Sequence, residues 1–302
     1  MERDEMLRQY ALLCDRMPDG NDLAEMERMR GVWYRTKSYR SGTLLEIEAY
    51  PLLPAPALRE VRRRKATSEA QARLNQRNAE KRLLRLAEAN FGESDYYFTG
   101  TIEGPDLPDW RTMQRLARAF LRRWNRARKK AGLENGKYIY VIEGHDDGDR
   151  KKRLHWHALL EGGLDRAEIK RLWSHGRARV DELDTRRPEG LAPLMKYLSK
   201  GPQGKKRWAG SRNLKKPAVS WADRKISART ARKIAEEKAG SGAALEALYP
   251  GHEVIDIEVR TNPYVPGCYI YARMRRSKVY GHAGRNDNES DRVADRTGQK
   301  GR

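Results

Sequence analysis

The sequence predicts an α+β fold built on a ferredoxin-like antiparallel sheet, and two observations lead to this prediction. The first is the alternation of strand-like and helix-like segments between residues 96 and 199, in the order β-α-β-β-α-β with short links. The second is that 302 residues with 38% hydrophobic content can bury one or two ordinary cores. We therefore expect one central domain with extensions at both ends.

Each element of the central domain has its own local signal. Apolar residues at helical spacing indicate the helices, and short runs of alternating or β-branched residues indicate the strands. The expected elements are a strand over 96–102, a helix over 110–130, strands over 138–143 and 154–160, a helix over 166–173, a short strand over 178–180 and a helix over 191–199.

The extensions carry weaker signals. Residues 1–30 suggest two short helices, residues 42–50 alternate as a strand, and residues 68–91 form a long basic helix that Gly92 ends. A Lys/Arg-rich segment over 205–238 precedes a hairpin with strands over 254–259 and 269–274, and the polar end after Tyr280 is typical of disorder. The expected division is an N-terminal extension (1–91), a core (92–202), a basic region (203–280) and a tail (281–302).

The charge balance points to a polyanionic partner. The chain has 63 Lys and Arg against 42 Asp and Glu, a formal net charge of +21. A protein this basic attracts nucleic acid whatever its fold, although charge alone does not specify a reaction. Cys14 and Cys268 form no disulfide or zinc pattern, and no segment reads as a signal peptide or a membrane span. We therefore expect a soluble cytoplasmic protein.

Two histidines in the strand over 154–160 are candidate metal ligands. His155 and His157 are two residues apart, so on a strand both imidazoles project from one face while Trp156 points to the other. Two neutral imidazole nitrogens on one face can hold a divalent metal.

Glu143 is the candidate third ligand. It ends the apolar strand over 138–143, just before a turn that leads to the histidine strand. If the two strands pair as a hairpin, the Glu143 carboxylate comes close to the imidazoles. The alternative is a solvated acid at a strand end. His145 is a reserve ligand, although its position fits a loop residue better.

Tyr197 and Lys200 lie three residues apart on the expected helix over 191–199 and its end, and therefore share one face. A phenol with a pKa near 10 is a poor nucleophile at neutral pH, so phosphoryl chemistry requires a cation or a base beside it. The alternative is that Tyr-x-x-Lys is an ordinary amphipathic pattern.

Together these segments resemble the three motifs of HUH-superfamily replication initiators. Phe98-Thr-Gly-Thr-Ile102, the histidine pair and the Tyr197-x-x-Lys200 pattern occur in that order, with the tyrosine after the histidines as in rolling-circle replication proteins and unlike relaxases. The segments 172–176 and 205–217 are similar to phage and prophage replication-associated proteins related to filamentous-phage initiators. The likeness covers roughly residues 40–235.

There are two departures from the pattern. Gly100 stands where the family usually has an apolar residue. No segment has the Gly-x-x-x-x-Gly-Lys-Ser/Thr spacing of a nucleotide-binding motor, so unwinding would need a host helicase.

The resemblance implies an HUH endonuclease fold and a rolling-circle replication initiator that nicks and rejoins single-stranded origin DNA. It implies Mg²⁺ or Mn²⁺ at His155, His157 and Glu143, a 5′-phosphotyrosine at Tyr197, and a phosphate-orienting role for Lys200. The partners of such a protein would be origin DNA, the host helicase and the host replication machinery. The expected DNA-binding residues of the basic region are Lys205, Lys206, Arg207, Arg212, Lys215 and Lys216.

Two other functions remain open at this point. A single-tyrosine HUH transposase shares the histidine pair and the downstream tyrosine. A non-catalytic protein could instead bind single-stranded nucleic acid on the sheet by base stacking. Its stacking residues would be Tyr96, Tyr97, Tyr138 and Tyr140.

Overall fold

The structure of the chain is a computed structural model that describes most of the sequence in seven stretches. These are residues 32–52, 68–103, 108–144, 154–199, 208–236, 242–262 and 265–277. The helices expected within residues 1–30 and the tail expected after Tyr280 lie outside the described residues. None of the described helices combines the length and apolar character that a membrane span requires.

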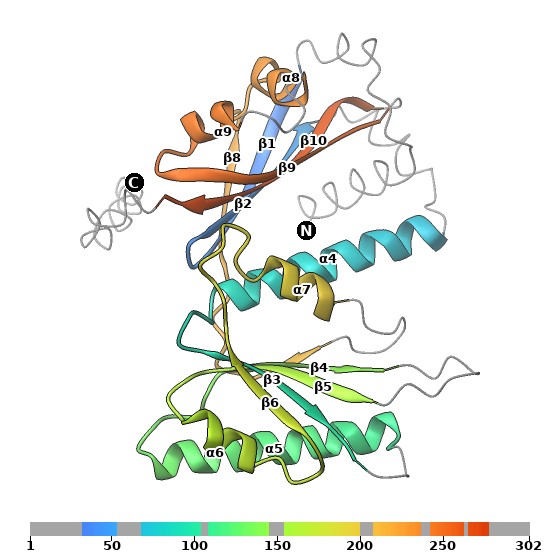
Figure 1. The fold of residues 1–302 in the computed structure, drawn as a ribbon. Helices are drawn as coiled ribbons and strands as arrows, with labels where there is room; N and C mark the ends of the chain where they lie inside the picture. The colour runs from blue at the N-terminus through green and yellow to red at the C-terminus, as the bar shows by residue number, and fades with distance from the viewer. Residues whose placement is uncertain are drawn as a thin grey trace, which may run out of the picture.

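The described strands form two five-stranded sheets with helices on their faces (Figure 1). One of them, which we call the histidine sheet because it carries His155 and His157, is antiparallel throughout and has the strand order β6-β3-β5-β4-β7. Its strands are β3 (Tyr96–Thr101), β4 (Tyr138–Glu143), β5 (His155–Leu160), β6 (Ala178–Glu182) and β7 (Ala209–Gly210).

Two helices, α5 (Trp110–Lys130) and α6 (Arg166–Arg171), pack on one face of the histidine sheet (Figure 1). The chain order β3-α5-β4-β5-α6-β6 with the sheet order β6-β3-β5-β4 is the ferredoxin-like arrangement. The predicted α+β fold class is therefore confirmed. The core under α5 is aromatic, with the ring centroids of Phe98 4.5 Å from Phe120 and 4.7 Å from Trp156.

Gly100, the departure noted in the first motif, has a steric reason. It pairs with Trp156 across the β3–β5 ladder, and a Cβ at this position would collide with the indole nitrogen of Trp156. Glycine therefore lets the indole pack directly over β3, which fills the core from the neighbouring strand.

The other sheet, which we call the terminal sheet, joins strands from both ends of the described chain in the order β8-β1-β2-β10-β9. The strand β2 was predicted two residues too early, over 42–50, and the strands of the β9–β10 hairpin were predicted at shorter lengths. The strands β1 and β8 were not predicted. The strands are β1 (Trp33–Ser41), β2 (Leu44–Leu52), β8 (Ala218–Asp223), β9 (His252–Asn262) and β10 (Val265–Arg276).

The two faces of the terminal sheet differ in character. Ile47 and Ile270 belong to the apolar face, which α8 (Ala228–Glu236) and α9 (Ala243–Leu248) cover. The opposite face carries polar side chains of β2 and β10, because residues that alternate along a strand point to opposite sides. This polar face turns toward α4 (Ser68–Glu88), as the contacts of Arg85 with β2 show.

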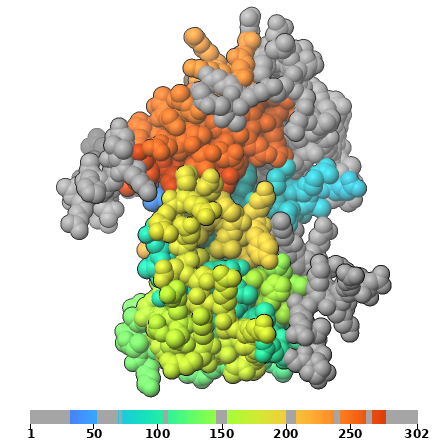
Figure 2. All heavy atoms as spheres, viewed as in Figure 1, coloured from blue at the N-terminus to red at the C-terminus, as the bar shows by residue number. Residues whose placement is uncertain are grey.

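Helices α4 and α7 (Ala192–Leu198) lie between the two sheets (Figure 1). Leu83 and Leu84 of α4 share one core with Met195 and Leu198 of α7 and with the face of the histidine sheet opposite α5. In the space-filling view the C-terminal strands and helices (orange) form the upper surface, and the chain around α6, β6 and α7 (yellow-green to yellow) forms the lower front (Figure 2). This layering places α7 over the histidine face of the sheet.

A candidate metal centre and the tyrosine beside it

Strand pairing brings the three candidate metal ligands together. Trp156 and Leu160 are buried in the core under α5, so the alternating residues His155 and His157 project from the opposite face of β5. In the antiparallel β4–β5 ladder, Glu143 is the direct partner of His155. The hairpin that the sequence analysis predicted therefore exists.

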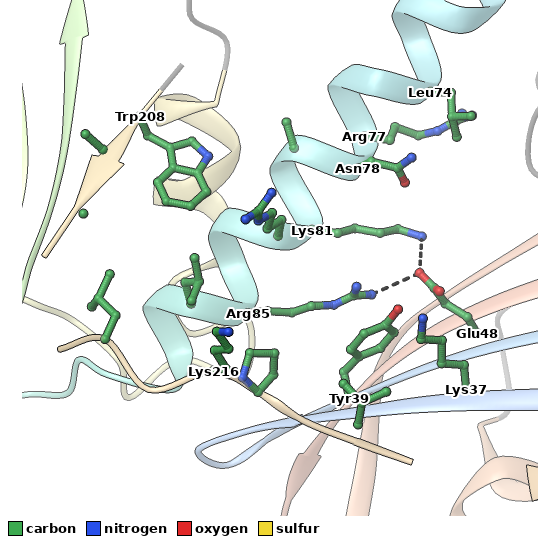
Figure 3. Close-up of a pocket in the computed structure, with 18 of the residues that line it drawn as sticks. Lys37, Tyr39, Glu48, Leu74, Arg77, Asn78, Lys81, Arg85, Trp208 and Lys216 are labelled. Atoms are coloured by element: carbon green, nitrogen blue, oxygen red, sulfur yellow. Dashed lines mark hydrogen bonds and ion pairs between the residues drawn. The ribbon is translucent and has the colours of Figure 1, made fainter. Parts of the chain in front are cut away.

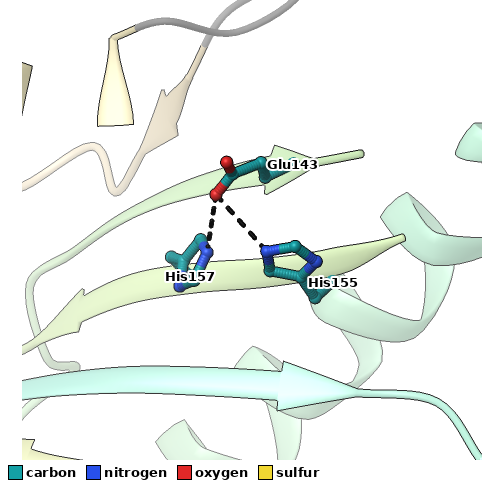
Figure 4. A group of neighbouring side chains, drawn as sticks. All are labelled: Glu143, His155 and His157. Carbon is teal, nitrogen blue, oxygen red and sulfur yellow. Dashed lines mark hydrogen bonds and ion pairs between the residues drawn. The ribbon is translucent and has the colours of Figure 1, made fainter. Parts of the chain in front are cut away.

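The ligand atoms of these residues converge on one point (Figure 4). Glu143 Oε2 lies 3.0 Å from His157 Nε2 and 3.4 Å from His155 Nε2. One ligand atom from each of the three side chains lies within 4.8 Å of the other two. Two imidazole nitrogens and a carboxylate oxygen form a mixed donor set that suits divalent transition metals and tolerates Mg²⁺, so these residues fit a metal ion. The reserve ligand His145 lies outside the described residues.

The second nitrogen of His157 is held by two hydroxyl groups. Its Nδ1 lies 2.7 Å from the Tyr97 hydroxyl and 3.1 Å from Thr99 Oγ1, and the Tyr97 ring stacks on the imidazole with 5.4 Å between the centroids. These contacts orient the ring so that Nε2 faces Glu143. Histidine ligands are commonly fixed in this way by a partner at the other nitrogen.

The sequence analysis did not find this role of Tyr97 and Thr99. Both residues alternate with buried Phe98 along β3, and Thr99 is the direct partner of His157 in the β3–β5 ladder. The alternation was readable from the sequence, but the register that sets Thr99 opposite His157 was not.

The environment of His157 keeps its imidazole neutral. His157 is only 5% exposed, and burial, followed by the charge of His155, lowers its pKa to about 4 despite the nearby Glu143 carboxylate. A neutral imidazole has a free lone pair, which is the form that binds a metal.

Tyr197 lies at the open side of this group. Helix α7 buries Met195 and Leu198 and leaves Tyr197 43% exposed, with its ring 6.0 Å from the His157 ring between centroids. The nearby Glu143 carboxylate, followed by burial, raises the pKa of Tyr197. The structure therefore places a phenol beside the candidate metal ligands and accessible from outside.

Other residues singled out from the sequence are placed as follows. Lys200, Lys205, Lys206 and Arg207 lie outside the described residues. Arg212, Lys215 and Lys216 are exposed.

The loop that carries the three exposed cations has a structural anchor on the histidine sheet. The Ser211 backbone N–H donates to Tyr138 O at 2.9 Å, and the Lys215 backbone N–H donates to Asn90 Oδ1 at 2.8 Å. This fastens the loop to the start of β4 and to the segment that follows α4.

The segment 172–176 also has a structural role. Trp173 Nε1 donates to Thr101 O at 2.9 Å, and the Glu103 backbone N–H donates to His175 O at 3.1 Å. Gly176 has φ +147° and leaves no room for a side chain against the backbone of residues 101–103. The motif therefore locks the end of α6 onto the end of β3.

One comparison with known proteins gave a match. Residues 95–202 match the model of a family described as Replication-associated protein ORF2. The matched segment runs from the start of β3 to just beyond α7, so it contains Glu143, both histidines and Tyr197. The resemblance to replication-associated proteins drawn from the motifs is thereby confirmed for this segment. Searches of curated proteins and of solved structures gave no match.

Proposed function

We propose that this chain is a rolling-circle replication initiator that nicks and rejoins single-stranded origin DNA through a 5′-phosphotyrosine. The observation that carries the proposal is the position of Tyr197 beside the candidate metal ligands, with 6.0 Å between the centroids of its ring and the His157 ring. The match of residues 95–202 to a replication-associated family supports a role in replication.

In the proposed reaction the Tyr197 oxygen attacks the scissile phosphorus in line. The P–O3′ bond breaks, the DNA 5′-phosphate becomes bonded to Tyr197, and the leaving 3′-oxygen takes a proton from solvent. The phenol proton passes toward the neighbouring Glu143 carboxylate. No water is consumed, so attack by a 3′-hydroxyl on the phosphotyrosine can rejoin the strand.

His155, His157 and Glu143 would hold Mg²⁺ or Mn²⁺, which when bound supplies positive charge to polarise the scissile phosphate. Tyr97 and Thr99 would keep the His157 ring in the orientation that presents Nε2. Lys200, three residues after Tyr197, would orient the phosphate. A host helicase would supply unwinding.

The position of two tyrosines weakens the non-catalytic alternative. Tyr140 is buried against Trp156 under α5, and Tyr97 is engaged with His157, so neither offers a free ring to a base. A single-tyrosine transposase would use the same chemistry, and the family match favours the replication function over it.

Capture of DNA in a covalent adduct tests the proposal. Wild-type protein with Mn²⁺ and a single-stranded oligonucleotide from its origin should give a denaturant-resistant adduct, and peptide mapping should find the DNA on Tyr197. Tyr197→Phe should give none and should still bind DNA. Tyr96→Phe is the matched control, because Tyr96 packs with the core on the α5 face of the sheet. An adduct on Tyr97, or one that persists in Tyr197→Phe, would overturn the proposed reaction.

A further inference from the structure

A large cleft lies where α4 meets the terminal sheet and the loop after β7. Its volume is about 1060 Å³, which is at the upper end of the range for ligand sites. Figure 3 shows Lys81 and Arg85 extending from α4 toward Glu48 on the terminal sheet, with Trp208 on the other side of the helix. The lining therefore continues around α4, from the terminal sheet to the edge of the histidine sheet.

The lining combines cations with aromatic rings. Eight Lys and Arg side chains line the cleft against two acids, Glu48 and Glu258, among the described residues. Three aromatic rings also line it, those of Tyr39, Trp208 and Tyr269. A groove with an excess of positive charge and interleaved aromatic rings is what proteins use to bind single-stranded nucleic acid. The eight cations are Lys37, Arg77, Lys81, Arg82, Arg85, Arg212, Lys216 and Arg260.

Part of this charge is neutralised within the protein. Lys81 Nζ lies 3.1 Å and Arg85 Nη2 lies 3.0 Å from Glu48 Oε1, and Arg85 Nε lies 2.8 Å from Glu46 Oε2. These pairs are buried and form the floor that holds α4 on the sheet. They set the shape of the cleft. Because these cations are already paired with carboxylates, we expect the cations at the rim of the cleft to bind phosphates.

The rim at Trp208 leads toward the candidate metal centre. The guanidinium of Arg82 lies 5.7 Å from the centre of the Trp208 ring, and Trp208 packs against the same core as Val141. Ala209 pairs with Tyr140 in the antiparallel β4–β7 ladder, so the chain before Ala209 continues in the direction of Glu143. Tyr140 and Glu143 are three residues apart, about 10 Å along a strand. The Trp208 edge of the cleft thus lies against the histidine face of the sheet, roughly 10 Å along the strand from Glu143.

We infer that this cleft binds the single-stranded DNA next to the scissile phosphate, with a base stacked on Trp208 and phosphates on Arg82, Arg212 and Lys216. That the bound DNA is the strand that is nicked rests on the proposed function. Binding of single-stranded DNA in the cleft can be measured without any cleavage. The cleft would hold several nucleotides beyond the reacting one, on elements outside the segment that matches the replication-associated family.

Binding of a fluorescently labelled oligothymidylate, followed by anisotropy over a salt titration, tests this inference. Each lost phosphate contact reduces the magnitude of the negative slope of log K against log salt by about 0.7. The triple variant Arg82→Gln/Arg212→Gln/Lys216→Gln should therefore reduce this magnitude by about 2. At 0.1 M salt this corresponds to a loss of affinity of about 100-fold. The matched control is Lys129→Gln/Lys170→Gln/Arg171→Gln, which removes the same charge from exposed positions on α5 and α6 and should leave the slope near that of the wild type.

Photocrosslinking gives a readout on the wild-type protein. An oligothymidylate with 5-bromouracil at successive positions should crosslink to Trp208 at one position. An unchanged salt slope in the cleft variant, or crosslinks confined to other parts of the chain, would overturn the inference. The covalent adduct on wild-type protein reports separately on the nicking function. An adduct without cleft binding overturns only the inference, and cleft binding without an adduct overturns only the proposed reaction.

Discussion

The two hydroxyl groups at His157 Nδ1 allow a quantitative prediction about the candidate metal centre. Tyr97→Phe removes the shorter contact, at 2.7 Å, and leaves Thr99 at 3.1 Å as a partner for the same nitrogen. Loss of such a partner of a metal-binding histidine costs about 10- to 100-fold in metal affinity. Because Thr99 remains, we expect the single change to lower Mn²⁺ affinity about tenfold, near 1.4 kcal/mol. Tyr97→Phe/Thr99→Val should approach a loss of about 100-fold.

Isothermal titration with Mn²⁺ measures these affinities directly and requires no cleavage. Tyr96→Phe is the matched control, since it removes the same hydroxyl from the neighbouring residue of β3, which packs with the core on the other face of the sheet. The reasoning is refuted if the double variant binds Mn²⁺ as tightly as the wild type while His157→Ala does not bind it. Mn²⁺ binding that survives in His157→Ala would remove His157 from the ligand set.

The remaining predictions concern the ligands and the anchoring of α4. His155→Ala and His157→Ala should each abolish adduct formation yet retain single-stranded DNA binding, because phosphate contacts elsewhere persist; full activity of the double variant after chelation would contradict the site. Glu143→Gln should raise the Mn²⁺ concentration needed for adduct formation, and a normal metal titration would exclude Glu143 as a ligand. Arg85→Met leaves the two buried carboxylates of β2 without this partner. It should lower the free energy of unfolding, measured with urea, by about 3–5 kcal/mol. A cost below about 1 kcal/mol would show that the pairs contribute little.

The elements of the histidine sheet were predictable because their signals are local. The helix α5 has the predicted bounds, and β5 begins one residue later than expected, at His155. Trp156, Ala158 and Leu160 had to face a core, which left the two histidines on the opposite face. The nearness of Glu143 followed from the pairing of β4 with β5, because strands that are consecutive in the chain commonly pair.

The strand order of the terminal sheet could not be predicted in the same way, although β2 and the β9–β10 hairpin had local signals. β1 has a polar sequence, yet Tyr34 and Thr36 are almost fully buried. They are buried because β1 lies between β2 and β8, and β8 comes from a distant part of the chain. Buried Glu46 interrupts the apolar pattern of β2, and its partner Arg85 lies 39 residues away on a helix. The periodicity of one strand indicates a buried face, but it does not identify a partner strand that is distant in sequence.

This long-range pairing bears on the candidate active site through α4. Arg85 ties α4 to the terminal sheet, and Leu83 and Leu84 pack the same helix against the core shared with α7. Nearer its N-terminal end, Gln76 Nε2 donates to Ser199 O at 3.0 Å, at the C-terminal end of α7 and two residues after Tyr197. The position of the proposed nucleophile therefore depends on a helix outside the segment that matches the replication-associated family, and on charged pairs with a sheet built from both ends of the described chain. Local sequence motifs identify Tyr197 as a candidate, whereas its position next to His157 is a property of the whole layered fold.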